Sequence, residues 1–168
     1  MNLLKYASLD QIFIDSNIFL DYAIPNPVFG EMASNFLERV EIEEISAVTT
    51  PAVLAEVSHI LLLEKGAVIL KNRNRNIVID KIEADRNFSC LCRDAVDKFN
   101  EYISNLDGLQ LIPVMPEDYF HASDLARAYN LMSFDALHLS AMIRTHIRNI
   151  ATRDRDFERV DGIMVWSL

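Results

Sequence analysis

The chain has 168 residues, of which 51% are hydrophobic and 24% are charged, and its formal net charge at pH 7 is −9. This length is enough for a substantial core without stapling disulfides, so we expect a single domain over residues 1–168. The acidic balance argues against a broad basic face for duplex DNA, but it leaves room for a nuclease whose carboxylates gather around a metal.

The N-terminus and the cysteines favour a cytoplasmic protein with no membrane partner. Residues 1–6 are too short for a signal peptide, and no apolar run approaches the roughly 18 residues of a membrane span. Cys90 and Cys92 are two apart in a predicted helix, so their side chains point away from each other and a disulfide is not expected. We therefore expect reduced thiols in a cytoplasmic protein.

The first half of the chain alternates between strand and helix patterns. We predict a strand over 11–14, a helix over 16–23, a helix over 28–42, a strand over 44–49 and a helix over 52–65. Thr50 suits the N-cap and Pro51 the first position of the last of these helices, and Gly66 suits its C-terminus. Because that helix is apolar on nearly every face, we place it centrally in the fold.

The second half begins with an extended helical segment over residues 66–106, in which we predict one or two long helices with a break near 87–89. After it we predict a strand over 109–114, helices over 116–130 and 133–144, a strand over 149–152, a helical turn over 156–159 and a strand over 163–166. Strands that alternate with helices predict an α/β fold, with a mainly parallel central sheet flanked by helices on both faces.

Four acidic residues occupy positions where such a fold gathers its ligands. Asp15 and Asp154 follow predicted strands, Glu56 lies on an apolar helix, and Asp135 lies in the first turn of another helix. Ligands of open α/β sheets bind outside the carboxyl ends of the strands. Clustered carboxylates repel one another unless cations hold them, and an oxygen-rich set without cysteines or paired histidines favours Mg²⁺ or Mn²⁺. Such ions catalyse phosphoryl transfer.

Each acid also has a local explanation. Asp15 could cap the helix that follows it, and the helix dipole favours any acid at the position of Asp135. Glu56 could pair with His59 three residues later. Asp156 is the alternative to Asp154 after the same strand, and we include it among the candidate metal ligands.

Four stretches of the chain resemble the acidic motifs of the PIN domain family, in the family's order and at compatible spacing. They are Phe13–Asn17, Leu54–Val57, Ser133–Leu139 and Ala151–Phe157. The chain is similar to the VapC-type toxins in particular, above all over residues 109–166. The resemblance implies a PIN-like fold and a metal-dependent ribonuclease. It also implies that Asp15, Glu56, Asp135 and Asp154 form the acidic site, while Ser16 or Asn17 orients the first aspartate or a water.

The same resemblance suggests the partners. A VapC-type toxin cuts RNA and is held in check by a small antitoxin protein, and we expect an arginine of that partner to reach the acidic site. We also expect a homodimer, with Phe19, Tyr22, Phe29 and Phe36 as candidates for an apolar contact surface beyond the core. Lys71, Arg73 and Arg75 form the densest basic cluster and are candidate contacts to RNA phosphates, although a solvated loop would look the same.

Three other functions compete with a toxin nuclease. One is a PIN nuclease of ribosomal RNA processing or RNA decay, with the same chemistry and no antitoxin. Another is a phosphatase-like α/β hydrolase, which needs a second acid two residues after the first, where this chain has Asn17. The third is a non-enzymatic binding module, which would have no need of all four acids.

Overall fold

One five-stranded sheet organises the computed structural model, which describes residues 1–168. The strands are β1 (Ile12–Ile14), β2 (Ala47–Thr49), β3 (Leu109–Leu111), β4 (Asn149–Ala151) and β5 (Met164–Trp166). They are ordered β3-β2-β1-β4-β5 and every neighbouring pair is parallel. All residues of β1, β2 and β4 are buried, as expected of parallel strands covered on both faces. The predicted α/β fold with a parallel central sheet is confirmed.

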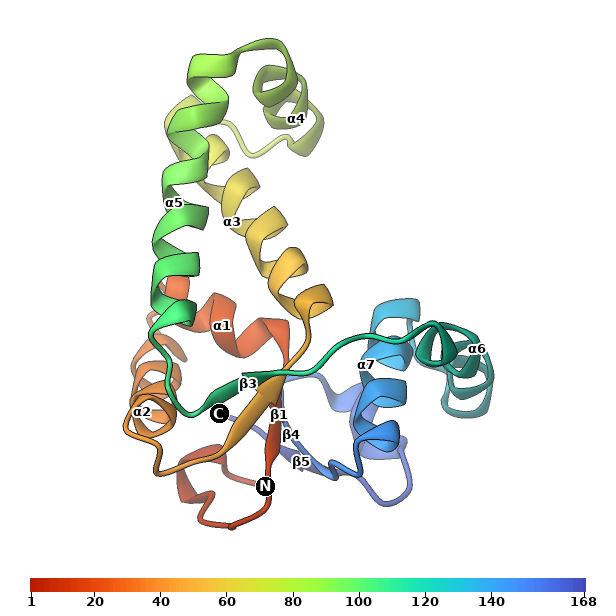
Figure 1. Cartoon of the computed structure of the whole chain (residues 1–168). Helices are drawn as coiled ribbons and strands as arrows, with labels where there is room; N and C mark the ends of the chain where they lie inside the picture. Colours follow the sequence, from red (N-terminus) through yellow and green to blue (C-terminus); the bar gives the residue numbers. More distant parts are fainter.

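The sheet reverses its strand order between β1 and β4. From β1 the chain moves to β2 and then β3 on one side, whereas β4 lies on the other side of β1 and leads to β5. Right-handed crossovers then place the helices of the two halves on opposite faces. Figure 1 shows α1 (Ser16–Ala23) and α2 (Gly30–Glu41) on one side of the sheet and α6 (Pro116–Tyr129) and α7 (Ser133–Arg144) on the other. Open α/β sheets bind their ligands at such a reversal.

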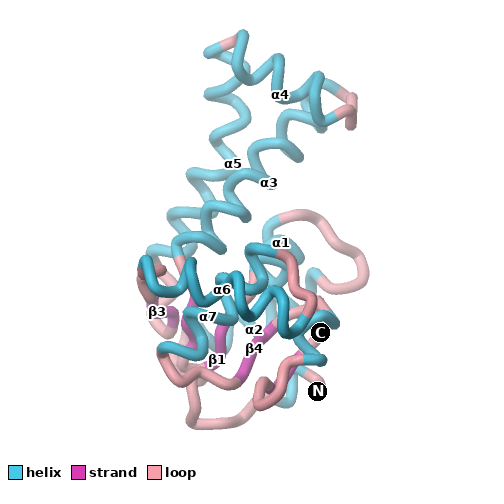
Figure 2. Tube along the Cα trace, turned by 90° about the vertical axis from the view of Figure 1, so that its right-hand side faces the viewer, coloured by secondary structure: helices cyan, strands magenta, loops and turns pink.

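The long segment between β2 and β3 forms a helical projection. It consists of α3 (Pro51–Leu70), α4 (Arg75–Ala84) and α5 (Arg86–Ser104). Figures 1 and 2 show α3 and α5 side by side, extending away from the sheet, with α4 packed at their far end. The break between the last two helices falls at Asp85, slightly earlier than predicted, because the Asp85 carboxylate caps α5 by accepting the Phe88 N–H at 3.1 Å.

The prediction that α3 ends at Gly66 is wrong. The helix continues to Leu70 and ends at Lys71, whose φ of +51° is in the left-handed region. Gly66 is instead buried in the middle of the projection, where a Cβ atom would lie 2.7 Å from Val78 Cγ1 of α4 and 3.4 Å from Cys92 Sγ of α5. Glycine therefore serves close helix packing here rather than helix termination.

The central placement of α3 holds only for its first half. Val53, Val57 and Leu61 belong to the main core, whereas the second half packs on α4 and α5 and leaves Val68 and Ile69 exposed. The base of the projection is anchored by Phe99 of α5, whose ring centroid is 5.8 Å from that of Phe19 in α1. Phe19 is thus a core residue and cannot serve as partner surface.

The two ends of the chain join the sheet. The first residues contain a 3-10 helix, η1 (Leu3–Lys5), and Asn2 forms a bridge with Ser167 next to β5. A second 3-10 helix, η2 (Arg155–Arg159), links β4 to β5. None of the helices has the length and hydropathy to cross a bilayer.

Candidate active site

Asp15 stands at the end of β1 and is almost entirely buried, with 5% of its surface exposed. It caps α1 by accepting the Ser16 N–H through Oδ1 at 2.7 Å. Its Oδ2 accepts hydrogen bonds from Asn17 Nδ2 and from Thr152 Oγ1, both at 2.6 Å. Burial raises the pKa of Asp15, and the hydrogen bond from Thr152 acts against that rise. The capping role and a place in the acidic cluster therefore coexist in one side chain.

Asn17 ties the start of α1 to the loop after β4. Its amide nitrogen lies 2.8 Å from Thr152 Oγ1 as well as close to Asp15, and its Oδ1 accepts the Arg153 N–H at 2.9 Å. Thr152 Oγ1 in turn accepts the Asp154 N–H at 2.9 Å. One network of polar groups thus fixes the two aspartates that follow β1 and β4 relative to each other.

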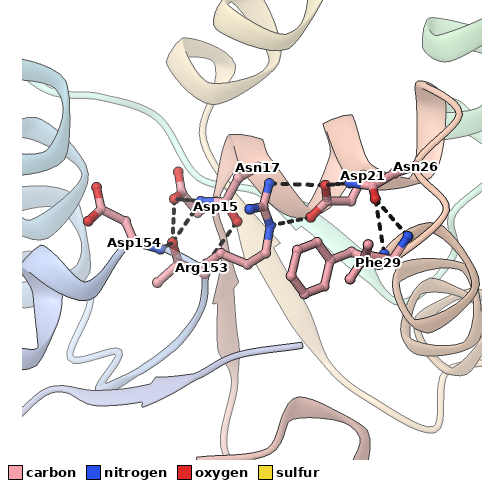
Figure 3. Close-up of polar contacts among 9 residues, drawn as sticks. Asp15, Asn17, Asp21, Asn26, Phe29, Arg153 and Asp154 are labelled. Carbon is pink, nitrogen blue, oxygen red and sulfur yellow. Dashed lines mark hydrogen bonds and ion pairs between the residues drawn. The ribbon is translucent and has the colours of Figure 1, made fainter.

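An ion pair with a buried carboxylate and a partly exposed guanidinium holds the same loop from its outer side. The Arg153 guanidinium binds both carboxylate oxygens of Asp21, with Nε at 2.5 Å and Nη2 at 3.0 Å. It also stacks 4.6 Å from the centroid of the Phe29 ring, while Asn26 donates to Asp21 at 2.7 Å. Figure 3 shows this arrangement beside Asp15. Because Arg153 directly precedes Asp154, the pair anchors the backbone that carries this acid.

Asp154 and Asp156 play different parts after β4. Asp154 caps η2, its Oδ1 accepting the Asp156 N–H at 2.8 Å. The Asp156 carboxylate is paired with the guanidinium of Arg159, which also donates to the Asn130 carbonyl at 3.1 Å. Asp156 therefore already has a cation of its own in this structure, and Asp154 has none.

Asp135 completes one side of the cluster from the first turn of α7. Burial raises the pKa of Asp135 to about 6, and the negative charges of Asp15 and Asp154 add to the rise. Glu56 contributes to the same repulsion. The structure thus brings Asp15, Glu56, Asp135 and Asp154 close enough for their charges to interact, from two strand ends and two helices.

Glu56 faces His138 rather than His59. Its Oε2 lies 4.0 Å from Nε2 of the buried His138 imidazole, which lowers the pKa of Glu56 while partial burial opposes that effect. The alternative explanation of Glu56, a local pair with His59, is wrong, because the exposed His59 turns toward α4 and its Nε2 meets Arg75 Nη2 at 2.7 Å. Ser16, nearly buried beside Asp15, also interacts with Glu56 and lowers its pKa.

Two residues of the basic cluster formed by Lys71, Arg73 and Arg75 contact side chains of α3. Arg75 contacts His59, one helical turn beyond Glu56, and Arg73 Nη1 lies 3.7 Å from Glu64 Oε2. Lys71, the third member, is exposed at the end of α3. Two of the three candidate RNA contacts thus extend along the helix that carries Glu56.

The donor set fits a hard divalent cation. All four clustered side chains offer carboxylate oxygens, the ligands that Mg²⁺ and Mn²⁺ prefer. Burial is the main cause of the raised pKa of Asp135, and repulsion by Asp15 and Asp154, which a cation would relieve, adds to it. No group of three or more acids, histidines or cysteines is arranged to hold a metal ion as it stands. Ligation by these residues therefore requires their side chains to move together.

Residues 12–163 match the family profile described as PIN domain. The chain belongs to the PIN domain family. None of the curated proteins compared with this PIN domain matches it in sequence.

Several solved structures share the fold of this PIN domain. VapC20 of Mycobacterium tuberculosis, a Sarcin-Ricin loop cleaving toxin, is 16% identical with a TM-score of 0.57, covering 88% of this chain and 92% of its own. A toxin-antitoxin complex from Klebsiella pneumoniae is 15% identical with a TM-score of 0.54, covering 91% and 95%. VapBC2 from Rickettsia felis, bound to a promoter DNA fragment, is 16% identical with a TM-score of 0.53, covering 94% and 98%. At these identities the likeness concerns the fold.

Four residues that hold the PIN site together were not predicted from the sequence: Asp21, Thr152, Arg153 and His138. The Arg153–Asp21 pair joins residues 132 apart, and the Thr152–Asp15 hydrogen bond joins residues 137 apart. No local pattern could have revealed these contacts. The one available signal was position, since Thr152 and Arg153 lie between a predicted strand and a candidate acid.

Proposed function

We propose that this PIN domain is a Mg²⁺- or Mn²⁺-dependent endoribonuclease, and that it is the toxin of a VapBC-type toxin-antitoxin pair. The observation that carries the proposal is the convergence of four carboxylates at the reversal of the sheet, with the pKa of Asp135 raised to about 6. Membership of the PIN domain family supports the nuclease assignment.

In this proposal Asp15, Glu56, Asp135 and Asp154 hold the ion. A divalent ion bound there supplies Lewis-acid chemistry for phosphodiester hydrolysis. The protein's own residues orient the ligands of the ion. Asn17 and Thr152 donate to one oxygen of Asp15 and so hold its carboxylate in a single orientation. Arg153 holds the loop so that Asp154 remains beside β1.

RNA is the proposed substrate, and one of the similar structures is a toxin that cleaves the Sarcin-Ricin loop. Arg73 and Arg75 line a groove between α3 and α4 together with apolar residues of both helices. We assign these arginines and Lys71 to RNA phosphates, because backbone contacts need cations and the chain as a whole is acidic.

We infer a cytoplasmic protein that is inhibited by a small antitoxin. Two of the similar structures are toxin-antitoxin complexes, which supports such a partner. Two unpaired cysteines, Cys90 and Cys92, are compatible with a reducing compartment. An arginine of the partner is suited to the acidic site, since its planar group can bind two carboxylates at once.

We propose that self-association uses α6 and α7 rather than the surface predicted from the sequence, which comprised Phe19, Tyr22, Phe29 and Phe36. Phe19 and Phe36 of that surface are fully buried. Large exposed apolar side chains instead gather on the two C-terminal helices and the turn between them: Tyr119, Phe120, Met132 and Phe134. A homodimer that buries them should dissociate in Phe120→Glu/Met132→Glu, which sedimentation velocity measures. A monomeric wild-type protein at micromolar concentration would exclude this surface.

The structure favours a nuclease over the phosphatase-like alternative. That chemistry needs an acid at position 17, where the Asn17 amide donates to Asp15 and accepts from the Arg153 backbone. An RNA-processing nuclease without an antitoxin remains the second candidate, because it would use the same four acids.

The test of the nuclease is cleavage of an unstructured single-stranded RNA with Mn²⁺ or with excess EDTA. We expect cleavage with Mn²⁺ only, and a loss of about two orders of magnitude or more in Asp15→Asn, which removes charge from the site. The matched control is Asp80→Asn, an exposed acid on α4. Undiminished cleavage in EDTA or by Asp15→Asn would refute the assignment.

A further inference from the structure

His138 is a buried polar side chain whose hydrogen-bonding capacity is unused. It lies on α7 with 1% of its surface exposed, and neither Nδ1 nor Nε2 has a hydrogen-bond partner. Its ring is near two phenylalanines, with centroids 5.8 Å from Phe13 and 6.4 Å from Phe134. Buried polar groups in native proteins are almost always partnered, so an unpartnered imidazole needs an explanation.

The imidazole faces the acidic site. Nε2 is 4.0 Å from Glu56 Oε2, a separation too long for a hydrogen bond but close enough for the two groups to face each other directly. Burial raises the pKa of both Asp15 and Asp135, and the His138 imidazole acts against both rises. His138 therefore interacts with acids from three different elements.

The Glu56 carboxylate has fewer hydrogen bonds than those of Asp15 and Asp154, which follow β1 and β4. Three donors fix Asp15, and Asp154 is fixed by the backbone of η2. The Glu56 carboxylate is about one-third exposed on α3, and its ion-pair contact is the one with His138. Ser16 lies near enough to influence Glu56, but no hydrogen bond holds the Glu56 carboxylate in the structure, so this side chain would lose entropy on ligating an ion.

We propose that His138 is the positioning residue for Glu56, donating from Nε2 to the Glu56 carboxylate when the acidic site closes on a divalent cation. This inference rests on the proposed function, because it takes Glu56 as a ligand. A movement of Oε2 by about 1 Å converts the present contact into a hydrogen bond of about 2.9 Å. The same movement carries Glu56 off the solvent side of α3 and gives the buried Nε2 its partner. Partners that orient ligands in this way change metal affinity about 10- to 100-fold when they are removed.

Two variants separate positioning from packing. His138→Leu keeps most of the bulk that packs near the two phenylalanines and removes the donor. His138→Gln places an amide N–H near the position of Nε2. Electron paramagnetic resonance of free Mn²⁺ then measures binding to the full chain without RNA. We expect binding to weaken about tenfold in His138→Leu and to recover largely in His138→Gln.

A double-mutant cycle with Glu56→Gln tests the route of the effect. If His138 acts through Glu56, His138→Leu should cause no further loss in the Glu56→Gln background. Equal binding by wild type and His138→Leu would overturn the inference, and so would an undiminished effect of His138→Leu without Glu56.

The wild-type protein provides a measurement that survives a folding defect in the variants. The ¹⁵N shifts of the imidazole, recorded with Mg²⁺ bound, should show a proton on Nε2 in a hydrogen bond. A proton on Nδ1 alone would contradict the proposed donor. A chain whose Mn²⁺ binding depends on Glu56 and His138 as expected but that cuts no RNA would refute the nuclease and leave this inference standing, whereas a chain that binds no Mn²⁺ would refute both.

Discussion

Asp135 offers the most direct test of whether the clustered carboxylates repel one another in the metal-free protein. Its pKa is raised from 3.8 to about 6, first by burial and then by the charges of Asp15 and Asp154. Between about pH 4 and pH 6 the native state therefore binds more protons than the unfolded chain. The contribution of this group to stability falls as pH rises through that window, and the full penalty remains above it.

We therefore expect Asp135→Asn to raise or preserve the melting temperature of the metal-free protein near pH 7.5, and to lose that advantage near pH 4. The variant should also shrink the stabilisation on adding Mn²⁺, since it removes a ligand charge. Circular dichroism melts at the two pH values measure both effects, with Asp80→Asn as control. A clear loss of metal-free stability near pH 7.5 would mean that Asp135 serves mainly its helix.

Single residues of the acidic cluster could be found from the sequence because each stands at a recognisable place. Asp15 and Asp154 follow apolar strand patterns, and strand ends gather at one edge of a parallel sheet. The residues that support the acidic cluster have no such position in the sequence. Asp21 looks like an ordinary acid on a helix, and only the fold brings it to Arg153, which is 132 residues later. The sequence also does not tell whether His138 is a core residue or a partner of Glu56.

At the scale of elements, Gly66 shows where local signals mislead. A glycine after an apolar helix predicts a C-terminus, yet here it permits α4 to approach α3, with the Val78 Cγ1 atom only 2.7 Å from a Cβ at this position. We expect Gly66→Ala to destabilise the protein by about 1–3 kcal/mol through overpacking, despite a gain of about 1 kcal/mol in helix propensity.

Thermal or urea unfolding measures the effect of Gly66→Ala, and Val78→Ala provides the matched control. Removing the two γ-methyl groups should relieve the clash, so Gly66→Ala/Val78→Ala should be more stable than the sum of the single changes predicts. Strict additivity would show that α3 and α4 do not touch at this point.

The basic cluster is the second feature of the projection that carries a prediction. Arg75 contacts His59 and Arg73 contacts Glu64, so both cations lie beside α3. A single-stranded RNA that leaves the acidic site along α3 would meet them. Replacing Lys71, Arg73 and Arg75 with glutamine should weaken RNA binding and reduce the salt slope by up to about 2, at about 0.7 for each single-strand phosphate.

Fluorescence anisotropy at several salt concentrations measures that slope, in a variant that keeps the four acids. The control replaces Arg86 and Arg93, exposed arginines on α5, with glutamine. A slope that changes by the same amount for each charge removed in both sets would reflect net charge alone, and an unchanged slope would leave the cluster as a solvated turn.

For the whole molecule, the order of elements and the parallel sheet followed from the alternation of strands and helices, whereas the reversal of the strand order came from the structure. The projection did not follow from that alternation either, because an apolar pattern reports that a helix is covered without reporting by what. The second half of α3 is covered by α4 and α5 instead of by the sheet. The acidic site consequently lies at the base of the projection, on which apolar residues such as Val68 and Ile69 remain exposed.

This arrangement bears on how a nuclease of this kind would be held inactive in its own cell. The net charge of −9 and four converging carboxylates make the site a receptor for cations, and a partner's arginine relieves the same repulsion as a metal. We expect the product of a neighbouring gene to co-purify with the chain and to block RNA cleavage. Replacing the partner's arginines should restore cleavage, while apolar contacts to the projection should still allow the partner to bind. If an excess of that partner leaves cleavage untouched, regulation by an antitoxin is wrong and an RNA-processing nuclease is the better account of the same four acids.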